Sequence, residues 1–162
     1  MFSDALLTEA RDLLAAARSK DMHIVTAESC TGGLIAALLT EIPGSSDVVD
    51  RGFVTYSNEA KQDLLDVPSD LLEAHGAVSE PVSRAMALGA LMNSRAELCV
   101  AVTGIAGPGG GSPEKPVGLV YIAAARRAGD VIVREYRFGD IGRDKVRHGT
   151  VERAVQLLRG CL

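Results

Sequence analysis

The stretch HIVTAESCTGGLIAALLTEI, residues 23–42, indicates how this chain begins to fold. Its opening letters, HIVTA at residues 23–27, form a short run rich in β-branched residues, which is typical of a strand. The letters from Cys30 to Ile42 have the apolar content of a helix, and the PGSS that follows ends it. Because a strand that runs directly into a helix is the repeating unit of α/β proteins, the stretch predicts a fold of that class.

Strand and helix patterns continue to alternate along the chain until two strands close the sheet. Residues 47–57 and 98–105 are strand-like, and the unbroken apolar character of the second predicts a buried strand. Residues 118–125 and 130–138 are joined by a short link, which predicts an antiparallel hairpin. Helical patterns are expected after Ser3 and over residues 58–65, 69–75, 80–94 and 142–159. We therefore expect one three-layer α/β/α domain over residues 1–162, with a mixed sheet that includes the C-terminal hairpin.

The composition argues against several classes of protein. With 162 residues, of which 47% are hydrophobic, the chain can bury a core and is not expected to be disordered. A net charge of −4 and an aromatic content of 4% argue against nucleic-acid binding. An acidic start and the lack of a long apolar run argue against a signal peptide and a membrane span. Three widely spaced cysteines fit a reducing cytoplasm, and no Cys or His pair has metal-ligand spacing, so we expect a cytoplasmic protein without a metal site.

The segment AESCTGG, residues 27–33, leaves two interpretations open. If the strand ends at about Ala27 and the helix starts at about Thr31, Ser29 lies at a helix N-terminus, where free N–H groups and the helix dipole favour negative charge. Such a serine is a candidate nucleophile, and Gly32 lets a ligand approach the backbone. Alternatively, Ser29 or Thr31 is only the helix N-cap. Cys30 is either a small buried hydrophobe or a second candidate nucleophile.

The segment TYSNEAKQDLL, residues 55–65, carries a lysine one turn into a short expected helix. Lys61 is either a solvated surface charge or, if it is partly desolvated, a general base with a lowered pKa. Tyr56 precedes it at the strand end. Its phenol orients the lysine amine, relays a proton, or merely covers the end of the strand.

Two further segments are candidate anion sites. The glycine- and proline-rich loop that begins at Gly104 either cradles an anion with its backbone N–H groups or is a flexible connection, and its length favours a function. Thr103, at the preceding strand end, is placed to donate a hydrogen bond to a ligand. Arg143, Lys145 and Arg147 cluster at the start of the last helix, either as an anion site or as a solvated helix face.

Five blocks of the sequence together resemble the C-terminal domain of the competence/damage-inducible CinA proteins: AESCTGG, RGFVTYSNEAK, HGAVSEPV, TGIAGPGGGSPEKPVG and GDIGRDKVR. The resemblance covers nearly the whole chain, and stand-alone members of the family are nicotinamide-nucleotide amidases. It implies hydrolysis of the carboxamide of nicotinamide mononucleotide to nicotinate mononucleotide and ammonia, in pyridine-nucleotide salvage, without a cofactor. The same resemblance implies that Ser29 and Lys61 are catalytic and that Tyr56 acts beside them.

These residues permit a Ser-Lys mechanism, in which neutral Lys61 takes the Ser29 proton and nearby backbone N–H groups hold the oxyanion. The residues expected to bind the substrate are Cys30, Thr31, Gly32, Thr103, Gly104, Gly107, Gly110, Arg143 and Arg147. We expect a small-molecule nucleotide as the binding partner, and the Ala-rich helices suggest a homo-oligomer. The alternative is a non-catalytic nucleotide- or phosphate-binding module that regulates a partner and is linked to competence.

Overall fold

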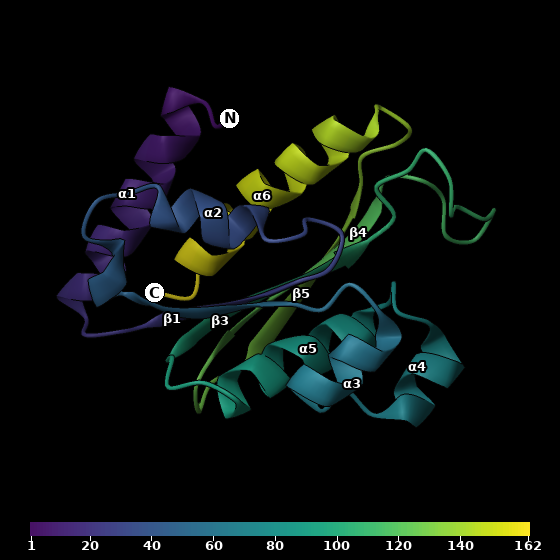
Figure 1. Ribbon diagram of the computed structural model, residues 1–162, viewed down its shortest axis with the longest axis horizontal. Helices are drawn as coiled ribbons and strands as arrows, with labels where there is room; N and C mark the ends of the chain where they lie inside the picture. Colours follow the sequence, from purple (N-terminus) through teal and green to yellow (C-terminus); the bar gives the residue numbers. More distant parts are fainter.

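A computed structural model, which describes residues 1–162, confirms the expected α/β class and has one five-stranded mixed sheet between two layers of helices (Figure 1). The strands are β1 (Ile24–Glu28), β2 (Val49–Val54), β3 (Leu98–Gly104), β4 (Leu119–Arg126) and β5 (Val131–Arg137). Their order is β2-β1-β3-β4-β5. β1 pairs parallel with β2 and β3, whereas β4 and β5 form the predicted antiparallel hairpin on the other side of β3.

The helices divide between the two faces of the sheet (Figure 1). One layer consists of α1 (Asp4–Ser19), α2 (Leu34–Thr40) and α6 (Arg143–Arg159). The other consists of α3 (Asn58–Leu65), α4 (Ser69–His75) and α5 (Glu80–Met92), and a 3₁₀ turn, η1 (Ser45–Asp47), leads into β2. Ser3, Ser57 and Ser79 cap α1, α3 and α5 as local sequence signals predict, each accepting a backbone N–H with its hydroxyl. No helix has the length and apolar content that crossing a bilayer requires.

The central strands are apolar throughout because both of their faces are buried. Alternate residues of β3 enter different cores: Val100 and Val102 join the core beneath α1, α2 and α6, whereas Cys99 and Ala101 join the core beneath α5. Small residues allow close packing on the α5 side. A Cβ atom added to Gly89 of α5 would lie 1.8 Å from the carbonyl oxygen of Leu65, so α5 and α3 meet backbone to backbone.

The strand order leaves a crevice at the carboxyl ends of β1 and β3. The chain leaves β1 through α2 toward β2 on one side, and leaves β3 through residues 105–118 toward β4 on the other side. In open α/β sheets, ligands bind where the connections of adjacent strands diverge in this way. Ser29 follows β1 directly and Thr103 lies at the end of β3, so the topology brings two sequence candidates to this crevice.

Candidate active site

A cavity of about 240 Å³ lies at this carboxyl edge, and it gathers candidate residues from four separate segments of the chain. Among the side chains and backbone that line it are those of Ser29, Cys30, Tyr56, Lys61, Thr103, Gly104 and Arg143. The segments that follow β1, β2 and β3 meet here with the start of α6. The fold therefore converts residues that are remote in sequence into one site.

The Ser29 hydroxyl and the Lys61 amine are in direct contact inside this cavity. Lys61 Nζ lies 3.1 Å from Ser29 Oγ and also donates to the carbonyl oxygen of Thr55 at 2.7 Å. Lys61 is only 1% exposed, so the alternative of a solvated surface lysine is wrong. Its backbone lies in the first turn of α3, and its side chain reaches back to the end of β2. Burial disfavours the ammonium form and lowers the pKa of Lys61 to about 8.

The loop from Ser29 to Gly33 differs from the expected helix start. Residues 30–33 form turns, and α2 begins only at Leu34, with Gly33 as its N-cap at φ +98°. Gly32 also has a positive φ, +59°, which a continuing right-handed helix does not allow. The expectations that Thr31 starts the helix and that Ser29 or Thr31 caps it are therefore wrong. The Gly-Gly pair provides a left-handed turn between strand and helix.

Glu28 performs the capping that we had assigned to Ser29 or Thr31. It is 0% exposed, and one of its oxygens, Oε2, accepts the Thr31 hydroxyl at 2.6 Å and two backbone N–H groups. The other oxygen, Oε1, accepts the N–H of Ala36 at 2.8 Å. Our sequence reasoning missed this residue. The available signal was an acidic residue at the end of an apolar strand, directly before a serine and a glycine pair.

Two backbone N–H groups beside Ser29 are left without an acceptor in the protein. The Ser29 N–H donates to Val102 O and the Gly32 N–H donates to Ser29 O, each at 3.0 Å. The N–H groups of Cys30 and Thr31 make no hydrogen bond to backbone or side chain. Cys30 lines the cavity, so its N–H is the candidate oxyanion donor of this loop, whereas Thr31 is fully buried and the Gly32 N–H is already occupied.

Arg143 connects three parts of the cavity wall. Its guanidinium donates to the carbonyl oxygen of Gly107 at 2.9 Å and to the Tyr56 hydroxyl at 2.8 Å. Tyr56 is 61% exposed, and no hydrogen bond joins its phenol to Lys61. The structure thus places Tyr56 as a support for Arg143 and does not place it as a direct partner of the lysine.

Other sequence candidates take positions that differ from our expectation. The Thr103 hydroxyl donates to Ala77 O at 2.9 Å, so it presents lone pairs to the cavity and not the donor we expected. Cys30 is buried, and desolvation raises the pKa of its thiol to about 12, which keeps it protonated and favours the hydrophobe over the nucleophile. Gly104 allows the end of β3 to lie close to β4, because a Cβ atom there would be 2.6 Å from Val120 Cγ2.

The remaining candidates do not line the cavity. Thr31 is buried and bonded to Glu28, Gly107 gives its carbonyl to Arg143, and Gly110 lies on the exposed part of the loop. Arg147 donates from Nε to Cys30 O at 3.1 Å and from Nη2 to Thr31 O at 2.9 Å. Its donors face the loop that carries Ser29, so the phosphate contact we expected from Arg147 is not supported.

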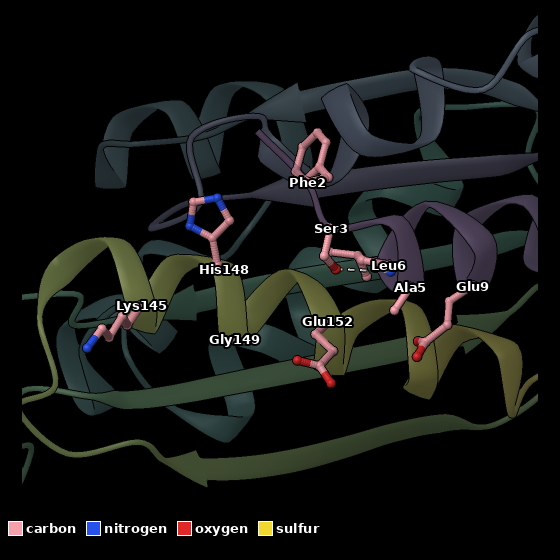
Figure 2. A pocket seen from close by; sticks show the side chains of 9 residues that line it. All are labelled: Phe2, Ser3, Ala5, Leu6, Glu9, Lys145, His148, Gly149 and Glu152. Carbon is pink, nitrogen blue, oxygen red and sulfur yellow. Dashed lines mark hydrogen bonds between the residues drawn. The ribbon is translucent and has the colours of Figure 1, made fainter.

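A larger cavity of about 420 Å³ lies elsewhere, between α1 and α6 (Figure 2). Figure 2 shows Phe2 close to His148, and the ring centroids are 6.4 Å apart. The one hydroxyl in this groove, that of Ser3, accepts the Leu6 N–H as the α1 cap. Because the groove pairs no nucleophile with a base, chemistry and not size identifies the cavity of Ser29 and Lys61 as the candidate active site.

Comparison with known proteins places the chain among CinA proteins. The CinA C-terminal domain family matches residues 7–162. The chain is 47% identical over 165 residues to a CinA-like protein of Anaeromyxobacter sp. (strain K), and the match covers 98% of this chain and 40% of that protein. It is 64% identical over 108 residues to a putative competence-damage inducible protein of Symbiobacterium thermophilum, covering 67% of this chain and 25% of the relative. The chain therefore spans less than half the length of these relatives.

Solved structures match the chain over nearly its full length. The crystal structure of the competence/damage inducible protein CihA from Agrobacterium tumefaciens is 53% identical, with a TM-score of 0.97, and the match covers 99% of this chain and 97% of that one. The competence damage-inducible protein A from Klebsiella pneumoniae is 33% identical, with a TM-score of 0.91 and a match to 96% of this chain and 95% of that one. Both have the same three-layer arrangement.

Proposed function

This chain belongs to the CinA C-terminal domain family, and from that premise and its cavity we propose that it hydrolyses the carboxamide of nicotinamide mononucleotide to nicotinate mononucleotide and ammonia. One observation carries the proposal: a buried lysine amine lies 3.1 Å from a serine hydroxyl in a cavity. A hydroxyl is a weak nucleophile at neutral pH and needs an adjacent base. A lysine whose pKa burial lowers to about 8 supplies such a base.

The acylation half of the reaction uses both side chains in turn. Neutral Lys61 takes the proton of Ser29 as Oγ bonds to the carboxamide carbon and the carbonyl π electrons move onto oxygen. The N–H of Cys30 holds the resulting oxyanion, an interaction worth about 3 kcal/mol per donor in other enzymes. The Lys61 ammonium then protonates the amide nitrogen, the carbon–nitrogen bond breaks, and ammonia leaves an acyl ester on Ser29.

The deacylation half repeats the same steps with water as the nucleophile. Lys61 takes a proton from water as the water oxygen bonds to the acyl carbon, and the Cys30 N–H again holds the oxyanion. The ester bond breaks, Ser29 Oγ regains a proton from Lys61, and the nicotinate product leaves as its carboxylate with release of one proton. Ser29 is therefore the only protein group that forms a covalent bond with the substrate in this cycle.

The nucleotide end of the substrate fits the other wall of the cavity. Arg143 lines the cavity, and only two of its nitrogens are engaged, by Gly107 and Tyr56. A guanidinium has five N–H donors, so donors remain for the phosphate oxygens of a nucleotide. Tyr56 then holds Arg143 in place, a role that differs from the one we expected from the sequence.

The proposal is tested by ammonia release from nicotinamide mononucleotide. Ser29→Ala and, separately, Lys61→Ala should each lower kcat by at least about 10³-fold, because either change removes the nucleophile–base pair. Ser46→Ala and Lys145→Ala, at exposed positions outside the cavity, are the matched controls and should retain turnover. Folded Ser29→Ala protein with near-native turnover would contradict the proposal. Binding of the nucleotide by wild-type protein without ammonia release would instead favour the regulatory binding module.

A further inference from the structure

Arg147 reaches from α6 to the loop that carries Ser29 and holds two consecutive carbonyl groups. Its Nε and Nη2 atoms donate to Cys30 O and Thr31 O, at 3.1 and 2.9 Å. Arg147 is the only group bonded to Cys30 O, whereas Thr31 O also accepts the N–H of Leu34 at 3.2 Å. The guanidinium lies beside the chain at Gly32, where a Cβ atom would be 3.4 Å from Nη2.

The planarity of the peptide group links this contact to the cavity. In a trans peptide, the carbonyl of one residue and the N–H of the next point in opposite directions. Because Cys30 O points to Arg147, the Thr31 N–H points away from it. Likewise Ser29 O accepts the Gly32 N–H, so the Cys30 N–H points away from Gly32. Neither N–H group has an acceptor in the protein, and Cys30, whose carbonyl Arg147 holds, lines the cavity of Ser29 and Lys61.

We propose that Arg147 is a positioning residue, which fixes the backbone of Cys30 through its carbonyl group so that the Cys30 N–H is already placed for the oxyanion when Ser29 attacks. This inference rests on the proposed function and assigns Arg147 no contact with the substrate. The loop needs such a support because Gly32 and Gly33 follow it directly, both at positive φ, and glycine restrains a backbone least. Glu28 fixes the far end of the same loop through Thr31 and the first N–H groups of α2.

A positioning role and a phosphate-binding role predict different kinetics. An oxyanion donor acts in the transition state, so losing its alignment lowers kcat and leaves KM nearly unchanged. A phosphate contact binds the ground state as well, so losing it raises KM. The split between kcat and KM therefore separates the two roles, and a reagent without a nucleotide phosphate separates them further.

A small alkyl fluorophosphonate is such a reagent. Ser29 Oγ bonds to phosphorus, the phosphorus–fluorine bond breaks, fluoride leaves, and the Ser29 proton passes to Lys61 Nζ. The phosphoryl oxygen takes the position of the amide oxyanion during this step. The rate of labelling, followed by intact-protein mass spectrometry, thus reports the alignment of the oxyanion donor and needs no nucleotide.

The experiment compares Arg147→Ala and Arg147→Lys with Arg153→Ala, an exposed arginine further along α6, as the matched control. Arg147→Ala should lower both the labelling rate and kcat for nicotinamide mononucleotide by roughly 10²-fold, with KM within about threefold, as for loss of one oxyanion donor. Arg147→Lys, which can hold one carbonyl, should lose roughly tenfold, and guanidinium added to Arg147→Ala should restore part of the rate. Arg153→Ala should match wild type.

The outcomes separate this inference from the proposed function. Wild-type protein that is neither labelled nor active contradicts the proposed function and this inference with it. Wild-type protein that is labelled, with Arg147→Ala labelled at the same rate, contradicts the inference alone, as does a raised KM with unchanged kcat. If circular dichroism shows that Arg147→Ala does not fold, Arg147→Lys is judged by the same two readouts.

Discussion

At the scale of single residues, Lys61 is held in an environment that opposes its own charge. Its amine is buried, and its partners, the Thr55 carbonyl and the Ser29 hydroxyl, are neutral. No carboxylate forms a salt bridge with it. Without such an ion pair, desolvation lowers the pKa, and the residue becomes a base within reach of physiological pH. Burial thus lowers the pKa of Lys61 far enough for its amine to serve as the base of the proposed mechanism.

We expect the pH dependence of turnover to follow this lysine. With a pKa of about 8, only the neutral fraction of Lys61 can accept the Ser29 proton, so kcat/KM should rise roughly tenfold per pH unit below 8 and level off above it. Lys61→Arg should abolish the rise and nearly all activity, because a guanidinium stays protonated. A pH–rate profile that is flat between pH 6 and 9 would show that another group is the base.

The same shift should appear in the stability of the fold. The pKa of Lys61 is lowered from 10.5 to about 8 on folding, so between these values the unfolded chain binds more protons and stability rises with pH. Below the lower value both states are protonated, and above the higher value both are neutral. Relative to Lys61→Met, the wild-type free energy of unfolding should therefore rise by about 3 kcal/mol across this window. Urea titrations at several pH values measure it, and Lys145→Met is the control. A constant difference would exclude the shifted pKa.

At the scale of elements, α2 depends on a carboxylate that precedes it in the chain. The helix has no capping side chain at Gly33, its N-cap. Both oxygens of Glu28 instead accept N–H groups from its first residues. The end of β1, the Ser29 loop and the start of α2 consequently form one hydrogen-bonded unit, whose rigidity keeps Ser29 at a fixed distance from Lys61.

Glu28→Gln should destabilise this unit. The amide nitrogen that replaces one carboxylate oxygen cannot accept a backbone N–H, so one buried donor loses its partner, and the other hydrogen bonds lose their charge. We expect a loss of about 2–4 kcal/mol in the free energy of unfolding, together with lower kcat. Denaturant unfolding measures the first quantity. Glu41→Gln, at the exposed end of α2, is the control. Equal stability of the two variants would show that the carboxylate cap is dispensable.

The sequence predicts the helices and strands well, because their patterns are local. It predicts poorly the long-range contacts that hold the site residues in place. The caps formed by Ser3, Ser57 and Ser79 are local features, because each is a contact over three residues. The strand and helix patterns are equally local. Arg147 contacts a loop more than a hundred residues earlier in the chain, and the burial of Lys61 depends on the end of β2. Contacts of that kind follow from topology and leave no periodic signal.

At the scale of the whole molecule, the two helical layers support Ser29 and Lys61 from opposite faces of the sheet. Ser29 is supported from the α2 and α6 layer, whereas Lys61 belongs to α3, which packs on α5 in the other layer (Figure 1). The distance between the two reacting atoms therefore depends on how closely α3 approaches α5. Gly89 sets that approach, because its position lies against the Leu65 carbonyl.

Gly89→Ala should separate α3 from α5. A Cβ atom 1.8 Å from a carbonyl oxygen cannot be accommodated without moving α3, and overpacking of this kind lowers stability by about 1–3 kcal/mol or more. Because α3 carries Lys61, turnover should fall further than the loss of folded protein explains. Leu88→Ala, on the exposed side of α5, is the control for both thermal unfolding and ammonia release. Turnover equal to that of the control would show that α3 does not set the Ser29–Lys61 distance.

The order β2-β1-β3 means that no partial stretch of the chain carries a complete cavity. Its walls come from segments after β1, β2 and β3 and from the start of α6, so the cavity is complete only once α6 has packed against the sheet. The proposed activity should therefore return later than the far-ultraviolet signal after dilution from denaturant, because single helices contribute to that signal before α6 completes the cavity.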